Sequence, residues 1–113
     1  MPRPRKPRFV QGRPIVDAFV PSSTPPWGTE EVTLSIEGLE AIKLNDHQGL
    51  DQETAARMMN VSRQTFGRIL IEARAIVADA LVMGKTLRIE GGHFEMPPGG
   101  RGRHRRRWRG GFQ

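Results

Sequence analysis

One short run of this chain holds the side chains best suited to recognising a nucleic acid: Ser62, Arg63, Gln64, Thr65, Gly67 and Arg68. Arginine and glutamine carry paired donors and acceptors that match the major-groove edges of guanine and adenine. Hydroxyl groups, and the free backbone amides at the start of a helix, are suited to phosphate oxygens. If a helix begins at Ser62, we expect Arg63, Gln64 and Arg68 to read bases. Ser62 and Thr65 would then contact phosphates.

The presence of glycine at position 67 needs an explanation, because a glycine inside a helix lowers helix stability by about 1 kcal/mol relative to alanine. Close approach of a DNA backbone at this position would be one reason. Packing beneath a neighbouring element would be another, and the sequence leaves both open.

Capping residues and apolar spacing predict the helices that would position this run. Ser35 and Asp51 are good N-caps, and each precedes residues with apolar side chains at helical spacing. The first helix is expected to lead into a turn at Asn45–Gly49. The second is short and ends at Asn60, a residue type that tolerates the left-handed conformation of a sharp helix exit.

The third helix is expected to start after Ser62 and to run to Met83, where Gly84 stops it. Ala56 is small enough for two helices to cross closely, and Asn60 falls at the turn between them. Three apolar side chains would form the core of the pair: Val61, Phe66 and Ile69. This combination is typical of a DNA-binding helix-turn-helix. An ordinary helical hairpin in another all-α domain is the alternative.

Beyond Met83, the residues Thr86–Glu90 and His93–Met96 alternate on either side of two glycines, which predicts a β-hairpin. Such a hairpin must pack on the helices or pair with another strand, for example around Val32–Leu34. The expected fold class is therefore mainly α: a three-helix helix-turn-helix domain with a long third helix and a small C-terminal hairpin.

The third helix carries a second apolar stripe on a different face: Ile71, Ala75, Ala78 and Val82. A three-helix core cannot cover two faces of one helix. Either the hairpin covers this stripe or a second copy of the chain does, and we expect a homodimer, which would also match two half-sites on DNA.

The positive charge lies at the two ends of the chain. Residues 1–28 hold five Lys/Arg against one acid, and residues 101–113 hold six Arg and no acid, whereas residues 29–100 hold seven Lys/Arg against eleven acids. We therefore expect a basic extended arm and loop over 1–28, the domain over 29–96 and a disordered Arg/Gly-rich tail over 97–113. Basic arms of this kind suggest a polyanionic partner, although they can also serve only for solubility. The expected auxiliary phosphate contacts are Arg3, Arg5, Lys6, Arg8, Arg101, Arg103, Arg105, Arg106, Arg107 and Arg109.

The sequence offers little for catalysis. His47, His93 and His104 are isolated from one another, and the chain contains no cysteine. It has no apolar run of about 20 residues that could span a bilayer and no apolar stretch of a secretory signal. We expect a cytoplasmic protein that is not an enzyme, has no cofactor or metal, and does not associate with membranes.

Several of these segments resemble uncharacterised protein family 0251 (domain of unknown function 134). They are the opening Met-Pro-Arg-Pro-Arg-Lys, residues 38–44, the run 60–70, and Gly84-Lys85 leading to residues 89–92. Members of that family are small prokaryotic proteins thought to bind DNA, with a helix-turn-helix similar to region four of bacterial sigma factors. The resemblance covers most of residues 1–94 but not the Arg-rich tail. Where members often carry cysteines in the basic arm, this chain has Pro7 and Gln11, and where they often carry an acid it has Gly38.

The expected function is sequence-specific binding of double-stranded DNA in transcriptional regulation. One alternative is RNA or non-specific nucleic-acid binding through the tails. The other is a protein-interaction module, because domains like sigma region four also dock on the transcription machinery.

Overall fold

The structure, a computed structural model, describes residues 7–96. It contains three α-helices, one π-helical turn and five short strands. In chain order they are β1 (Arg8–Phe9), β2 (Ala18–Phe19), β3 (Glu31–Leu34), α1 (Ile36–Ile42), η1 (Lys43–His47), α2 (Gln52–Met59), α3 (Arg63–Met83), β4 (Thr86–Ile89) and β5 (Phe94–Glu95).

The three helices begin where the capping residues predicted. The side chains of Ser35, Asp51 and Ser62 each accept a hydrogen bond from the backbone N–H three residues further on, at 2.7–3.0 Å. Asn60 ends α2 with φ of 61°, and Gly84 ends α3 with φ of 68°, both in the left-handed region. The helix bounds were thus encoded by local capping chemistry.

The segment expected to be a turn at Asn45–Gly49 is helical as far as His47. Instead of ending, α1 continues into the wider π-helical turn η1. Arg74 of α3 holds this segment: its guanidinium donates to the Asp46 carboxylate at 2.6 and 3.1 Å and to Asn45 Oδ1 at 3.0 Å. The hydrogen bonds from Arg74 also lower the pKa of Asp46 below its usual value. This contact joins residues distant in sequence, which the local turn signal at Asn45–Gly49 does not include.

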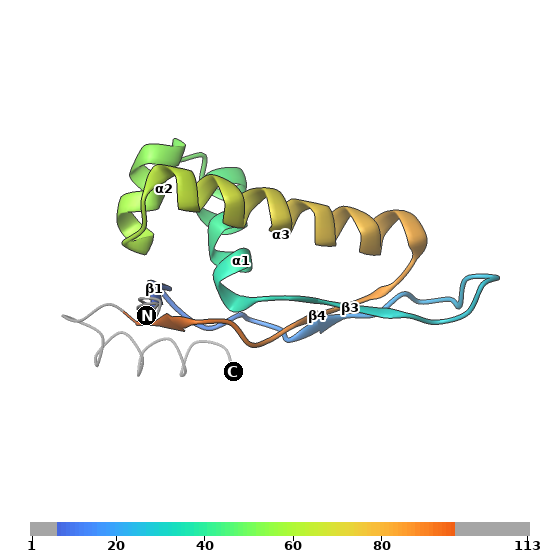
Figure 1. The fold of residues 1–113 in the computed structure, drawn as a ribbon. Helices are drawn as coiled ribbons and strands as arrows, with labels where there is room; N and C mark the ends of the chain where they lie inside the picture. Colours follow the sequence, from blue (N-terminus) through green and yellow to red (C-terminus); the bar gives the residue numbers. More distant parts are fainter. Residues whose placement is uncertain (1–6, 97–113) are drawn as a thin grey trace, which may run out of the picture.

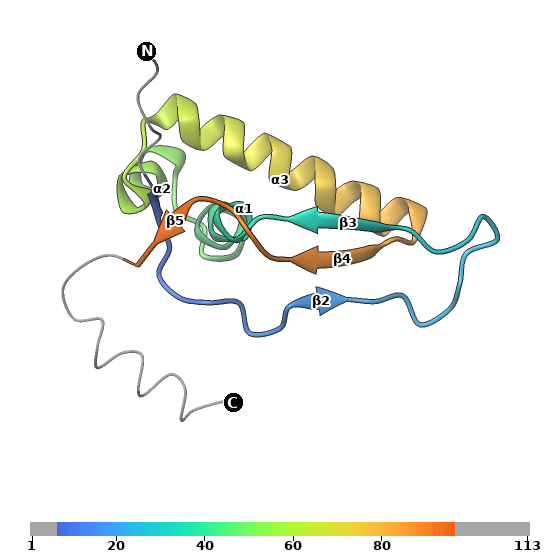
Figure 2. The ribbon, with the colours of Figure 1, turned by 60° about the horizontal axis from the view of Figure 1, so that its bottom comes forward.

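The strands form two small sheets (Figure 2). One has the order β2-β4-β3, in which β4 is antiparallel to β2 and parallel to β3; the other pairs β1 with β5 in parallel. Because β3 and β4 are parallel, the chain must cross over between them, and the three helices form that crossover. Figure 1 shows all of the helices on one side of the three-stranded sheet.

The expected hairpin after α3 does not form. Thr86–Ile89 and Phe94–Glu95 belong to different sheets, and the first of these strands pairs with Glu31–Leu34. The alternative partner around Val32–Leu34 is confirmed. With two sheets beside its three helices, the chain matches the expected mainly α class only in part.

Two apolar clusters form the core. One lies among the helices and contains Phe66, Met59 and Leu44, each 0% exposed. The other joins the sheet to α1 and α3 and contains Leu34, Ile89 and Val10. Val10 is 1% exposed although it precedes residue 29. Part of the segment expected to be an arm therefore belongs to the folded body.

Candidate nucleic-acid interface

The helices α2 and α3 meet at a sharp turn of three residues, 60–62. Ala56 is 2% exposed where the helices cross, and its carbonyl accepts a hydrogen bond from the backbone N–H of Val61 at 3.0 Å. Phe66 fills the space between the two helices. This packing fixes the direction in which the first turn of α3 leaves the body, and Figure 1 shows that turn beside α2 at one end of the molecule.

Three polar side chains project from the start of α3. Arg63, Gln64 and Arg68 are exposed, and none of them makes a hydrogen bond or an ion pair with residues 7–96. Their donors and acceptors are therefore available to a partner. The structure brings together on one turn and a half of helix the residues that the sequence assigned to base reading.

The hydroxyl groups at the start of α3 are engaged with each other. Ser62 Oγ accepts from the Thr65 backbone N–H and donates to Thr65 Oγ1, both at 3.0 Å. The proton of the Thr65 hydroxyl stays free to donate outwards, whereas Ser62 acts mainly as the helix cap. Of the two expected phosphate contacts, Thr65 has the better geometry.

Asp51, the cap of α2, lies close to this turn. Its pKa is lowered mainly by the hydrogen bond from the Thr54 backbone N–H, then by the Thr54 hydroxyl and by the charges of Arg57 and Arg63. The Asp51 carboxylate stays ionised, so one negative charge lies close to the positive charges of Arg57 and Arg63. Arg57 is exposed, with its guanidinium 3.4 Å from Thr54 Oγ1. The sequence reading did not single out this arginine, although the outward positions of the predicted second helix would have indicated it.

The two helical glycines have different surroundings. A Cβ at Gly67 would lie 3.7 Å from Gln52 Oε1, an ordinary van der Waals distance. A Cβ at Gly38 would lie 2.9 Å from Leu34 Cδ1 and 3.3 Å from Ala73 Cβ. Packing within residues 7–96 thus accounts for glycine at position 38, where α1 approaches α3, but not at position 67.

Among the expected auxiliary contacts, the structure describes only Arg8. It is 8% exposed in β1, and its Nη1 lies 3.6 Å from Glu37 Oε2. This guanidinium faces an acid inside the body and is not presented to phosphate. The other expected contacts lie outside the described residues: Arg3, Arg5, Lys6, Arg101, Arg103, Arg105, Arg106, Arg107 and Arg109.

Over residues 7–96 there is no group of three or more His, Asp or Glu side chains placed to hold a metal ion. In the same part of the chain, no helix has the length and apolar character needed to cross a membrane.

Comparison with known proteins places the chain among close relatives. The family described as "protein of unknown function DUF134" matches residues 1–97. A UPF0251 protein of Caldanaerobacter subterraneus subsp. tengcongensis is 50% identical over 113 residues, covering 96% of both chains. Relatives in Thermoanaerobacter pseudethanolicus and Moorella thermoacetica are each 52% identical over 96 residues, covering 85% of this chain and 81% and 64% of their own lengths. No solved structure matches this chain. The protein therefore belongs to the DUF134 (UPF0251) family.

Proposed function

We propose that this protein binds double-stranded DNA in a sequence-specific manner and regulates transcription. In this proposal α2 and α3 act as a helix-turn-helix similar to sigma region four, with α3 as the reading helix. One observation carries it. Arg63, Gln64 and Arg68 project unpaired from the first turns of a helix whose exit direction is fixed by a left-handed Asn60.

Each side chain would have a distinct role at the major groove. Arg63 and Arg68 offer paired donors to guanine, and Gln64 offers a donor and an acceptor to adenine. Thr65 and the free amides of the first helical turn would hold a phosphate. The acidic balance of residues 29–100 does not oppose this arrangement, because binding depends on the local potential around α3.

The test is selection of bound duplexes from a random DNA pool at a stated salt concentration, followed by Arg63→Ala. We expect the variant to bind the selected sequence about 5- to 150-fold more weakly, which corresponds to ~1–3 kcal/mol, and to lose preference at one base pair. Arg13→Ala is the matched control, because Arg13 is also exposed but lies outside α3. The sequence preference of the Arg13→Ala variant should be unchanged. Equal weakening of all sequences by Arg63→Ala would argue against base reading.

Deletion of residues 101–113 separates this proposal from non-specific binding. Removing six arginines should weaken binding to every sequence alike and flatten its dependence on salt, because fewer counterions are released. If selection gives no preferred sequence and single strands compete as well as duplexes, the tails dominate and the protein is a general nucleic-acid binder. If the amide chemical shifts of residues 62–68 do not change with any duplex, docking on a protein becomes the better interpretation.

A further inference from the structure

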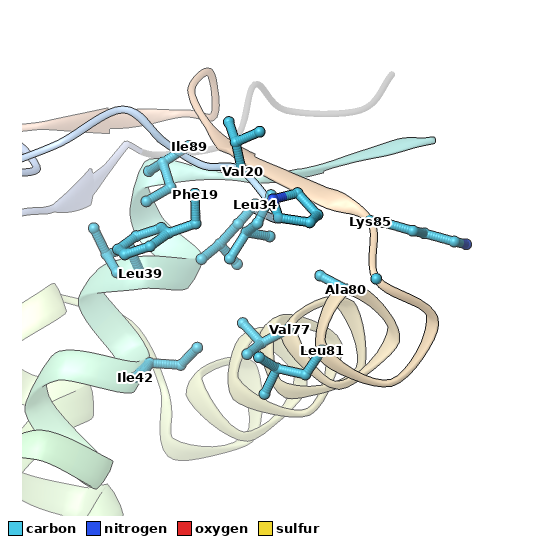
Figure 3. A pocket seen from close by; sticks show the side chains of 13 residues that line it. Phe19, Val20, Leu34, Leu39, Ile42, Val77, Ala80, Leu81, Lys85 and Ile89 are labelled. Carbon is cyan, nitrogen blue, oxygen red and sulfur yellow. The ribbon is translucent and has the colours of Figure 1, made fainter. Parts of the chain in front are cut away.

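An apolar groove lies at the end of the molecule away from the start of α3. Its volume is about 530 Å³, and it lies between the sheet and the C-terminal half of α3 (Figure 3). Phe19 and Val20 of the β2 region form one wall, and Val77 and Leu81 of α3 form the other. The floor contains Leu34, Leu39, Ile42, Leu87 and Ile89.

The groove lacks polar groups that would orient a small polar ligand. Among residues 7–96, Lys85 is the one charged residue in the lining, and its ammonium pairs with Asp79 at 2.7 Å and Glu30 at 3.4 Å. Figure 3 shows the Lys85 side chain directed away from the apolar residues. Small-molecule sites normally combine apolar walls with a few inward-facing polar groups. The lining is therefore better suited to the apolar side chains of a protein.

The apolar surface continues from the groove around α3. Leu81 is 78% exposed at the rim, and Val82 and Ile71 on the outer face are 76% and 68% exposed. Ala75 and Ala78, which lie between them on the same stripe, are also exposed. Nothing within residues 7–96 covers this stripe, and the hairpin that was one candidate cover does not form.

We propose that the groove and the outer stripe of α3 together form a dimer interface, occupied by a second copy of this chain. The surface has a hollow and, beside it, a ridge made by Leu81 and Val82. A two-fold axis between them places the ridge of each copy in the groove of the other, so one surface is complementary to itself. Because the ridge of one copy fills the groove of the other, no partner other than a second copy is needed.

The exposed area agrees with a dimer. Phe19 is 58% and Val20 is 69% exposed; with Leu81, Val82 and Ile71 they present on the order of 600 Å² per copy, the upper end of the largest apolar patch on a typical monomer. Mutual burial would remove about 1,200 Å² in total, the lower bound for specific interfaces, before any polar rim is counted. Apolar patches of this size are often functional. The tail is a poor substitute, because six of its thirteen residues from 101 to 113 are arginine.

The test is the mass of the full chain in solution, measured by light scattering at micromolar concentration without DNA. It is independent of the proposed DNA binding. We expect twice the 12.7 kDa of one chain for the natural sequence. Leu81→Glu and Val20→Glu, which change the ridge and the opposite wall, should each halve the mass. Both side chains are largely exposed, so circular dichroism should show an unchanged fold.

Ile15→Glu is the matched control, because Ile15 is 77% exposed but does not line the groove. It should remain a dimer. A monomeric natural chain would overturn the proposal, and a small molecule retained in native mass spectrometry would then assign the groove to a ligand. The dimer proposal would also be contradicted if Leu81→Glu and Val20→Glu both remain dimeric, or if Ile15→Glu loses the dimer as they do.

Discussion

At the scale of single residues, the two helical glycines show how one residue type can serve two purposes. Gly38 lies where α1 touches Leu34 and Ala73, and a methyl group would also press on the Ser35 hydroxyl that caps the helix, at 3.1 Å. Gly67 has no such neighbour. Its lower helix propensity is therefore not offset by packing within residues 7–96.

Alanine at each position should have opposite effects on the free energy of unfolding. We expect Gly67→Ala to stabilise the fold by ~0.5–1 kcal/mol, because alanine restricts the unfolded chain and favours the helix. Gly38→Ala should destabilise it by about 1 kcal/mol or more, through overpacking and disturbance of the cap. Urea unfolding of both variants measures whether each substitution raises or lowers the free energy of unfolding.

Gly67→Ala also tests how closely DNA approaches α3. Under the proposed function, Gly67→Ala should bind its selected duplex more weakly although it folds more stably, because the methyl group would occupy space next to the DNA backbone. Unchanged affinity would show that position 67 does not contact DNA.

At the scale of elements, the turn between α2 and α3 depends on one backbone conformation. Asn60 adopts φ of 61°, which costs most non-glycine residues about 1–2 kcal/mol. Asn60→Gly should therefore preserve stability, whereas Asn60→Ala should lose about 1 kcal/mol in thermal or urea unfolding. Equal stability of the two variants would show that the left-handed conformation is not what fixes this turn.

The helices and the exposed side chains at the start of α3 could be predicted from the sequence because their signals are local. Ser35, Asp51 and Ser62 act on backbone groups within three residues, and the period of apolar residues shows which face is buried. The same period placed Arg63 and Gln64 outside. Phe66, expected in the core, is 0% exposed.

The strands could not be predicted in the same way, because pairing is a choice between distant segments. The alternation over 86–90 shows a strand but not its partner, and the nearby glycines suggested a hairpin. Instead, β4 enters the centre of a sheet, with β2 and β3 on either side. The packing around Gly38 and the groove could not be predicted for a related reason: close approach and hollow space exist only after the elements have packed.

At the scale of the whole molecule, the proposed reading turn lies at the start of α3, and the groove lies beside its C-terminal half. The outer stripe runs from Val82 back to Ile71, so the proposed dimer interface extends along α3. The first turn of α3 and Leu81 are separated by about 25 Å along the helix at 1.5 Å per residue. Two copies joined near Leu81 would place their reading turns up to about 50 Å apart, and closer together as the angle between the two helices narrows. The spacing of successive major grooves on one face of DNA, ~34 Å, lies within that reach.

This arrangement predicts a two-fold DNA site. If both proposals hold, footprinting should show two half-sites about one helical turn apart for the natural chain. Leu81→Glu should protect a single half-site and lose cooperativity, with its sequence preference retained. A variant that lost dimerisation but still filled both half-sites cooperatively would show that the groove does not set the spacing.

The pairing of β1 with β5 has a consequence for the two ends of the chain. Arg8 lies opposite Phe94 and Phe9 opposite Glu95, so residues 7 and 96 are anchored within a few ångströms of adjacent strands, and β1 also contacts α2. The basic segments before and after these points are therefore attached to the body close to one another. Under the proposed function, binding of either segment to a nucleic acid would raise the local concentration of the other, and the two would act as a bivalent pair.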